Sequence, residues 1–598
     1  MGYTTIGSLI NQTRKEKKGI TRQKLADGLC SAQMLYQIEN DQYESDPLLT
    51  DILLQRLGKS PDKFERMLQT EMYRMVRVRD LLEKSILKGK KILAEQILKT
   101  YPLRTNVDKM FQYRMKAFLL YHIDKDYDKA LENLYAAIHT TLPNFTHDTI
   151  ENYMISTVEM ENLLAIEKVN IEKKLDEEKL KEKKHLNIYI NYIDKHFVDD
   201  EEHSKIYAKC VWLLACVYYN EGKYLHVMSL CENGMEGLRR NTMIYFIIPL
   251  LELMVQAGEK LGIAPEHNRW GQYYEVLAFL WKSFAEKWYP TNMIFHNCYQ
   301  KEYHLDYEMI RDERKTRGMT QENFADGIYQ DVGSLSHFET GKTSPNKKTF
   351  EKMIRKLGME KGRYNGYVVT DSFEIMELRS NMDILLMRRK YDKARELLEE
   401  LKRHLDMGVR ENNVIVEFHE TVIANRLGEI TAQEAFENIK EQIKGFMDYD
   451  RMVFYHIPMR NEVLIINNVC LLLYDIGQEE DAVRLFRSVL QRIRGSKVDV
   501  KYRYRSYAIL LNNYVRRQRE WKNACEGLKN ELICGKAAGL PFCLNNISKI
   551  LEREGASDKE LDQWAKAIYY MSDLYYFDNE KEIYRKYLRE ERQIKIID

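Results

Sequence analysis

The chain has 598 residues, and its 92 Lys and Arg against 91 Asp and Glu leave a formal net charge of +1. With 44% apolar and 31% charged residues, the composition excludes wholesale disorder, and the length predicts about three to five domains. Only 10 Pro and 28 Gly are present, which is sparse for a β-rich protein and favours an all-α chain. Because the net charge is nearly neutral, any nucleic-acid contact must come from local basic patches.

The N-terminal sequence MGYTTIGSLINQTRKEKKG contains no apolar signal segment. The most apolar stretch, 243–251, is far shorter than the ~20 residues of a membrane helix. Nine Cys are scattered without a Cys-x-x-Cys motif, which is typical of reduced thiols. We therefore expect a cytoplasmic protein with no membrane partner.

Two segments resemble each other, ITRQKLADGLCSAQMLYQIE at 20–39 and MTQENFADGIYQDVGSLSHFE at 319–339. Identical residues recur at offsets of 299 or 300: Thr21 and Thr320, Ala26 and Ala325, Asp27 and Asp326, Gly28 and Gly327, Glu39 and Glu339. The dipeptides Arg14-Lys15 and Arg314-Lys315 lie upstream, and Pro47 and Pro345 lie downstream. This pattern predicts a tandem duplication of one unit, roughly 1–300 and 301–598.

In the second copy, Thr320 is a suitable N-cap for a short helix from Gln321 to Gly327. A second helix is expected from Val332 to Phe338, with Leu335 and Phe338 facing inward. Two short helices locked by small residues at their crossing predict a helix-turn-helix, whose second helix is sized for the DNA major groove.

Both segments resemble the Xre/Cro-type helix-turn-helix regulators, through the Thr-Gln opening, the Phe-Ala-Asp-Gly crossing and the Phe-Glu-x-Gly-Lys-x-Ser-Pro close of the second copy. The first copy departs from this pattern, because Arg22 replaces Gln321, Asn40-Asp41 replaces Thr340-Gly341, and Lys18 is an additional residue. The DNA affinity of the first copy is therefore left open.

The resemblance implies two sets of DNA contacts. Base edges would be met by Ala32, Gln33, Tyr36 and Gln37 in the first copy and by Val332, Gly333, Ser336 and His337 in the second. Gln side chains suit adenine edges, whereas Val332 and Gly333 favour a thymine methyl or shape readout. The backbone phosphates would be met by Arg14, Lys15, Arg22, Arg314, Lys315, Gln321 and Lys342, supported by Lys17, Lys18, Arg311, Arg317, Lys347, Lys348 and Arg355.

Long amphipathic helices follow each helix-turn-helix, and the similar segments Tyr127–Ala137 and Tyr391–Leu398 are interpreted as equivalent. Related turns recur roughly every 34–45 residues, as in tetratricopeptide-like helical hairpins. An irregular helical bundle is the alternative. The expected domains are two helix-turn-helix domains at 1–68 and 301–366, each followed by a helical-repeat domain, at 69–300 and 367–598. The charged run 167–184 is expected to be an exposed helix or connector.

This domain order resembles the RRNPP peptide-pheromone receptors of the Rgg and PlcR type. The resemblance implies a short peptide ligand held by asparagines of the inner helices. Matching pairs occur in the second copy, Asn467-Asn468, Asn512-Asn513 and Asn545-Asn546, with Arg516 and Arg517 nearby for an acidic group. We expect the three pairs to line one groove, and interhelix hydrogen bonding is the alternative. The first copy has Trp212-Leu213, Pro249-Leu250 and Asn162 instead, so its repeat is expected to be structural or to bind an apolar ligand.

The main functional hypothesis is a ligand-responsive, sequence-specific DNA-binding transcription regulator. The two units would form an internal pseudo-dimer that reads an imperfect palindrome in double-stranded DNA, and further dimerisation stays open. The alternative is a protein-interaction scaffold with vestigial helix-turn-helix units. We predict no enzyme, cofactor or metal site, since the sequence has no phosphate-binding Gly loop, His-Glu-x-x-His or Gly-x-Ser-x-Gly motif.

Overall fold

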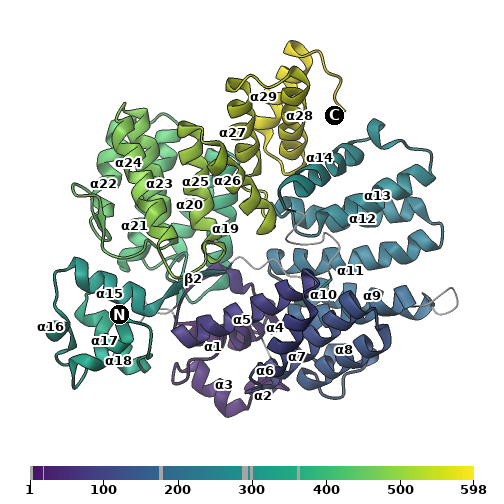
Figure 1. Ribbon diagram of the computed structural model, residues 1–598, viewed down its shortest axis with the longest axis horizontal. Helices are drawn as coiled ribbons and strands as arrows, with labels where there is room; N and C mark the ends of the chain where they lie inside the picture. The colour runs from purple at the N-terminus through teal and green to yellow at the C-terminus, as the bar shows by residue number, and fades with distance from the viewer. Residues whose placement is uncertain are drawn as a thin grey trace. The chain divides into compact units, whose positions relative to one another are not determined.

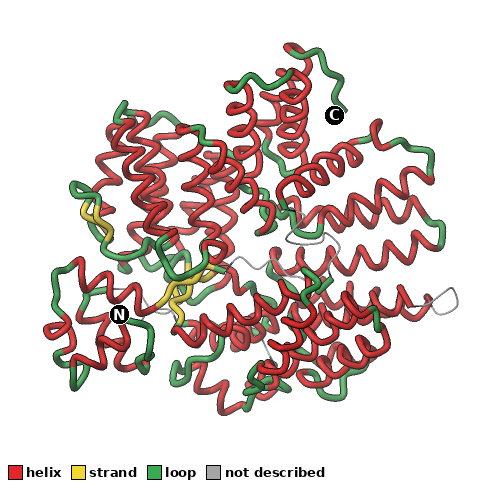
Figure 2. Tube along the Cα trace, viewed as in Figure 1, coloured by secondary structure: helices red, strands yellow, loops and turns green. Residues whose placement is uncertain are grey.

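The computed structural model describes residues 5–17, 19–173, 179–285, 294–295, 301–359 and 364–597. Helices dominate these residues, with short strands between them (Figures 1 and 2). The predicted all-α class is confirmed, whereas the strands were not predicted. Within the described part of the chain, no helix combines the length and the apolar character that crossing a membrane requires.

The chain forms two compact units whose segments alternate along the sequence. Unit 1 comprises Met1–Leu9, Asp62–Met75 and Tyr299–Asn530, and unit 2 comprises Ile10–Pro61, Val76–Cys298 and Glu531–Asp598. The four predicted domains are stretches of sequence rather than compact units, and their boundaries stay a prediction.

Unit 1 contains the short strands and the helices of the middle of the chain. Its strands are β1 (Phe64–Leu68), β2 (Glu302–Leu305), β3 (Tyr364–Gly366), β4 (Met447–Asp448) and β5 (Val453–Phe454). Its helices are α15 (Asp306–Thr316), α16 (Gln321–Ala325), α17 (Val332–Glu339), α18 (Lys347–Lys356), α19 (Phe373–Met387), α20 (Tyr391–His404), α21 (Arg410–Arg426), α22 (Ala432–Ile443), α23 (Arg460–Asp475), α24 (Glu479–Arg494), η5 (Val500–Tyr502), α25 (Tyr504–Gln518) and α26 (Trp521–Ile533), which ends just past the unit boundary.

Unit 2 contains the remaining helices, of which α1, η1 and α5 cross the unit boundary. They are α1 (Ile6–Glu16), α2 (Arg22–Ala26), α3 (Ala32–Glu39), α4 (Pro47–Arg56), η1 (Pro61–Lys63), α5 (Thr70–Leu87), α6 (Lys91–Thr100), α7 (Asn106–Leu119), η2 (Leu120–Asp124), α8 (Tyr127–Thr141), η3 (His147–Asn152), α9 (Thr157–Lys173), α10 (Lys179–His196), α11 (Asp200–Asn220), α12 (Tyr224–Arg240), α13 (Ile247–Lys260), η4 (Pro265–His267), α14 (Arg269–Phe284), α27 (Leu540–Arg553), α28 (Asp558–Leu574), α29 (Asp578–Lys586) and η6 (Tyr587–Glu591).

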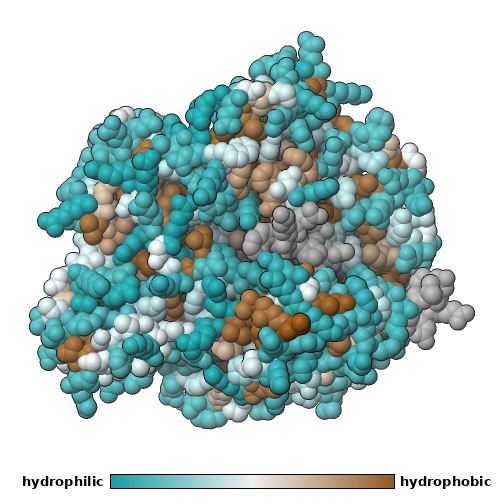
Figure 3. Space-filling model, in the orientation of Figure 1, coloured by the Kyte–Doolittle hydropathy of each residue, from teal (hydrophilic) through white to brown (hydrophobic). Residues whose placement is uncertain are grey.

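Local sequence signals explain where these helices begin and which face they bury. The Thr320 hydroxyl accepts a hydrogen bond from the Asn323 amide at 3.2 Å and so caps α16. Helix α20 buries Ala394, Leu398 and Leu401 at helical spacing. Large apolar side chains are mainly interior, and the face in Figure 3 is largely hydrophilic, with apolar side chains in small separate patches.

Consecutive helices pack as hairpins in both units. In unit 1, each helix from α19 to α24 contacts the α-helix that follows it, and α23 also contacts both α21 and α25 (Figure 1). In unit 2, α9, α11 and α13 make the corresponding series. The helical-hairpin architecture predicted from the recurring turns is therefore present. The charged run 167–184 ends α9 and begins α10, and residues 174–178 lie outside the described residues.

The order of the helices corrects one equivalence predicted from sequence. Tyr127 begins α8, the fourth helix after α4, whereas Tyr391 begins α20, the second helix after α18. By order and by the offset of 300, Tyr391 corresponds to Lys91, the first residue of α6. The two tyrosine segments look alike because each is the second helix of a hairpin and presents the same buried face.

The strand β1 is the centre of a three-stranded sheet in unit 1, parallel to β2 and antiparallel to β3. Glu65 lies opposite Glu302 in the β1–β2 register, and both residues are buried. Glu65 accepts hydrogen bonds from the backbone amide of Arg460 at 2.8 Å and from His304 Nε2 at 3.1 Å. Burial, reinforced by the charge of Glu65, raises the pKa of Glu302 to about 7.

This raised pKa makes the stability of the sheet dependent on pH. Folded Glu302 keeps its proton up to about pH 7, whereas the unfolded chain releases it near the ordinary Glu value. The stabilisation is therefore full below the ordinary value and declines as pH rises toward 7, by up to roughly 3 kcal/mol. We expect Glu302→Gln to remove this decline, measured by hydrogen exchange of the β1 and β2 amides at pH 5 and pH 8 after correction for intrinsic rates. Glu396→Gln, an exposed change on α20, is the control, and an identical pH response in both variants would contradict the assignment.

Candidate functional site

In unit 1, the short helix α16 and the following α17 present one exposed face. Leu335 and Phe338 of α17 are fully buried, as predicted. On the opposite side of α17, Gly333 and His337 are exposed and Val332 and Ser336 are half-buried. The four residues predicted to meet base edges therefore share one accessible helix face.

Unit 2 contains the corresponding pair, α2 and α3. Leu35 and Ile38 are buried, Gln33 and Tyr36 are exposed, and Ala32 and Gln37 are half-buried. The guanidinium of Arg22 lies 5.1 Å from the centre of the Tyr36 ring, which restrains both side chains on this face. The first copy thus presents larger and more polar groups than the second.

The N-caps of the two exposed helices differ in charge. The Ser31 hydroxyl accepts the Met34 amide at 3.0 Å at the start of α3, whereas the Asp331 carboxylate accepts the Ser334 amide at 2.8 Å at the start of α17. Hydrogen bonds from Ser334 lower the pKa of Asp331, so the second copy carries a negative charge at this helix N-terminus. A phosphate near α17 would meet that charge, whereas one near α3 would not.

Two of the predicted phosphate contacts are corrected by the structure. Arg14 Nε donates to Glu39 at 2.5 Å, and Arg314 Nε donates to Glu339 at 2.5 Å, in pairs related by an offset of 300. The two arginines are 8% and 5% exposed. Both guanidinium groups are buried and paired with a glutamate, so we do not expect them to contact DNA phosphates. An Arg-Lys dipeptide does not reveal which residue faces inward, and in both copies it is the Arg.

The other side chains predicted to contact phosphates fall into two groups, those that bind a buried glutamate and those that are exposed. Arg22 and Gln321 also bind the buried glutamates, Glu39 at 2.5 Å and Glu339 at 2.8 Å. Three exposed lysines make no ion pair or side-chain hydrogen bond within the described residues: Lys15, Lys315 and Lys342. Lys18 lies outside the described residues. The predicted supporting contacts Lys348 and Arg355 are also exposed on α18.

The asparagine pairs of unit 1 lie on neighbouring helices. Asn513 of α25 donates to Asn467 of α23 at 2.9 Å, and Asn467 is 2% exposed. This bond matches the interhelix alternative for these two residues. Asn468 and Asn512 are half-buried, and the Asn468 amide donates to the carbonyl of Leu464 in its own helix. Asn468 and Asn512 therefore remain as candidates for ligand contact.

The third predicted pair belongs to a different unit. Asn545 and Asn546 lie on α27, which is part of unit 2, so the structure does not bring all three pairs together in one unit. Asn545 accepts a hydrogen bond from the Tyr584 hydroxyl at 2.6 Å. Within unit 1, only the pairs on α23 and α25 lie on helices that contact each other, and the groove of three pairs stays a prediction. In the first copy, buried Asn162 accepts from Arg114 at 2.7 Å, which gives it a packing role.

Arginines gather at the C-terminal ends of α19, α21 and α25 in unit 1. Burial and the nearby charges of Arg517, Arg389 and Arg426 lower the pKa of Arg516, so these three arginines lie close enough to act on Arg516. Asp475, at the end of α23, lies 3.8 Å from Arg426 and offsets part of the charge. With Asn468 and Asn512, these four arginines define what we name the Asn–Arg face. It combines amide groups with an excess of positive charge, which suits a ligand with peptide bonds and an acidic group.

Residues 310–362 match the protein-family model described as "Helix-turn-helix". The matched residues include all of α16, α17 and α18 and most of α15. This segment is a helix-turn-helix domain. Helices α1–α4 begin 299 or 300 residues before α15–α18.

Solved structures with similarity to the chain include three bacterial regulators. They are Bacillus thuringiensis PlcR in complex with the peptide PapR7 and DNA (16% identity, TM-score 0.31, 46% of this chain and 96% of that chain), ComR from S. thermophilus in complex with DNA and its signalling peptide ComS (16%, 0.28, 47% and 97%), and the Streptococcus dysgalactiae SHP pheromone receptor Rgg2 (13%, 0.16, 47% and 99%). These TM-scores are too low to establish a shared overall fold. The chain has no match among curated proteins.

The helix-turn-helix domain of unit 1 is attached to the helical repeat through α15. Buried His456 contacts Glu313 of α15 at 2.8 Å through Nδ1 and Glu462 of α23 at 2.8 Å through Nε2. Although burial opposes ionisation, hydrogen bonding by His456 and the charge of Arg317 hold the pKa of Glu313 below its ordinary value. Arg492 of α24 adds a bond of 2.8 Å to Asp312.

The corresponding helices of unit 2 are attached differently, through α4. Arg56 donates to Glu159 of α9 at 2.5 Å and to the carbonyl of Thr141 at 2.9 Å. A Cβ at Gly28 would lie 2.1 Å from the Thr141 carbonyl oxygen, so the repeat closes directly over this turn. The equivalent Gly327 has nothing within 4 Å, and Lys356, equivalent to Arg56, is exposed. The two copies therefore use different helices to dock on their repeats.

The buried pair Arg314–Glu339 generates a stability prediction. Arg314→Ala would leave Glu339 buried without its main partner, at a cost of about 3 kcal/mol. We expect hydrogen exchange of α15–α17 amides to accelerate on the order of 100-fold, because each 1.4 kcal/mol corresponds to a factor of about ten. The control is Lys315→Ala at the adjacent exposed position, which we expect to leave exchange unchanged. Equal acceleration in both variants would show that the pair does not hold the domain together.

Proposed function

We propose that the chain is a cytoplasmic, sequence-specific DNA-binding transcription regulator. The observation that carries this proposal is the helix-turn-helix domain at 310–362, whose helix α17 exposes Gly333 and His337. Exposed Lys342 and Lys315 flank the helix and supply the positive charge that phosphate binding needs. The first copy would contribute Gln33, Tyr36 and Gln37, which offer more hydrogen-bonding groups for bases.

We further propose that the chain is a tandem duplication folded as an internal pseudo-dimer. Helices α1–α14 and α15–α28 correspond in order. In the β1–β3 register, Glu65 pairs with Asn365, its own counterpart 300 residues later. A residue near a two-fold axis meets its own equivalent in a symmetric dimer, so this pairing supports a pseudo-two-fold relation between the halves.

Two contacts in unit 2 support the same relation. The backbone of Met243, between α12 and α13, forms an antiparallel bridge with Lys536, between α26 and α27. Helix α14 packs against its counterpart α28, where the Tyr273 hydroxyl donates to Asp573. In each case equivalent elements of the two copies meet. A pseudo-dimer would read an imperfect palindrome with half-sites about one helical turn apart.

A short peptide with an acidic group is the ligand that we propose for the Asn–Arg face. Support comes from half-buried Asn468 and Asn512, since an amide side chain can donate and accept at once, and from the proximity of Arg389, Arg426 and Arg517 to Arg516. Binding there would bias the placement of the attached helix-turn-helix domain, because α23 carries both Asn468 and the Glu462 partner of His456.

We expect the purified chain to bind its own upstream DNA more tightly than random DNA in a fluorescence-anisotropy titration. Lys342→Ala should weaken binding to all sequences and reduce the slope of log K against log salt by about one. His337→Ala should instead reduce the preference for the specific site, by about 1–3 kcal/mol. Lys393→Ala, an exposed change on α20, is the matched control.

Affinity no greater than for random DNA at two salt concentrations would favour the second candidate, a helical-repeat interaction scaffold with vestigial helix-turn-helix units. Specific binding by a single chain to a site with two half-sites would support the pseudo-dimer.

For the ligand, we expect fluorescent synthetic peptides from short reading frames beside the gene to include one that binds saturably. Asn512→Ala should lower its affinity on the order of 10-fold through the loss of a hydrogen bond in a partly buried site. Asn438→Ala, an exposed change on α22, should leave affinity unchanged. Equal affinities in both variants would place the peptide elsewhere.

A further inference from the structure

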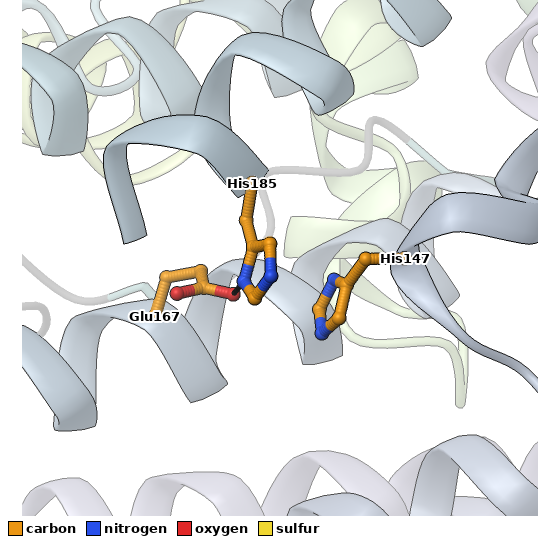
Figure 4. Close-up of side chains that lie close together, drawn as sticks. All are labelled: His147, Glu167 and His185. Carbon is orange, nitrogen blue, oxygen red and sulfur yellow. Dashed lines mark hydrogen bonds and ion pairs between the residues drawn. The ribbon is translucent and has the colours of Figure 1, made fainter. Parts of the chain in front are cut away.

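Three metal-binding side chains converge in the first helical repeat, within unit 2. His147 lies on η3, Glu167 on α9 and His185 on α10 (Figure 4). One candidate ligand atom from each residue lies within 4.8 Å of the other two. No motif spacing joins these positions in the sequence, since they come from three separate elements.

The cluster is organised around one oxygen of Glu167. His185 Nδ1 lies 2.9 Å from Glu167 Oε1, and the Tyr189 hydroxyl lies 3.3 Å from the same atom and 2.7 Å from His147 Nδ1. Ligands about 2.1 Å from a tetrahedral zinc ion lie roughly 3.4 Å apart, so these spacings are close to those of a metal site. A cation could take the place of the protons that now bridge the nitrogen and oxygen atoms.

The buried carboxylate of Glu167 is only partly satisfied by hydrogen bonds. The residue is 1% exposed, and its second oxygen, Oε2, has no hydrogen-bond partner among the described residues. Burial, with a further contribution from Glu182, raises the pKa of Glu167. A buried carboxylate with a free oxygen is costly, and a bound cation is one way to satisfy it.

The two imidazole rings belong to His147 and His185, and the Nδ1 atom of His147 contacts the Tyr189 hydroxyl at 2.7 Å. The rings are stacked, with centroids 3.5 Å apart and an interplanar angle of 8°. Parallel rings do not aim their lone pairs at one point, so His147 must turn on binding. His147 is half-buried and lies on the short 3-10 helix η3, at the edge of the cluster.

We propose that His147, Glu167 and His185 form a binding site for a divalent transition metal, with zinc as the ion that best suits two imidazoles and a carboxylate. Water or the Tyr189 hydroxyl would complete the coordination. The site lies in the repeat that lacks the asparagine pairs, so the first copy would sense a metal ion where the second has the Asn–Arg face. This goes beyond the DNA and peptide binding proposed above.

The test is a zinc titration of the tag-free, EDTA-stripped full chain by isothermal titration calorimetry, with cobalt absorption spectra as a second readout. We expect one zinc ion per chain with His147→Ala and Glu167→Gln each weakening binding by at least about 10-fold. His203→Ala is the control, because half-buried His203 lies outside the cluster, where it bonds to Asp194 at 2.9 Å and stacks on Tyr207.

Absence of saturable zinc binding would overturn the proposal, as would unchanged affinity in His147→Ala. Circular dichroism would check that each variant is folded, and if Glu167→Gln were unfolded, His147→Ala would decide, since His147 is on a surface turn. The titration contains no DNA or peptide, so its outcome is independent of the regulator proposal.

Discussion

The backbone hydrogen bonds of β1 are the constraint on which the arrangement of the chain depends. The chain leaves unit 2 after Pro61, forms the central strand between β2 and β3, and returns to unit 2 at Val76. The sheet therefore joins a segment of the first half to two segments of the second. Buried polar contacts reinforce it, including Lys301 with Asp62 at 3.2 Å and His304 with Glu65. Without β1, the strands β2 and β3 would have no neighbour in the sheet.

Buried ion pairs hold elements of the fold together in both units. In each copy an arginine that could face DNA is turned inward to a glutamate, and each helix-turn-helix segment is attached to its repeat through further buried acid–base pairs. Such pairs contribute little net stability compared with apolar packing, but removing one partner is costly, so they define which arrangement is allowed. The charge left for DNA is carried by a few exposed lysines, in keeping with the near-neutral composition.

The features that sequence reasoning predicted are local ones. The first residues of α16 and α17 agree with the prediction from the N-cap Thr320 and the spacing of Leu335 and Phe338, whereas α16 ends at Ala325 rather than at Gly327. The hairpins follow from helical periodicity. The strand β1 could not be predicted, because its partners lie more than 230 residues away and short strands have no distinctive pattern. The division of the three asparagine pairs between two units could not be predicted for the same reason, since periodicity does not reveal which neighbour a helix packs against. The cluster of His147, Glu167 and His185 is likewise created by packing.

The two helix-turn-helix segments are attached to their repeats in different ways, so they are not equivalent to each other. A homodimer on a palindrome looks the same from either flank, so it cannot distinguish upstream from downstream. In this chain, α4 closes on the repeat over Gly28, whereas Gly327 stays open and α15 makes the attachment instead. Because the readers also differ in sequence, a bound chain would have one orientation on its operator.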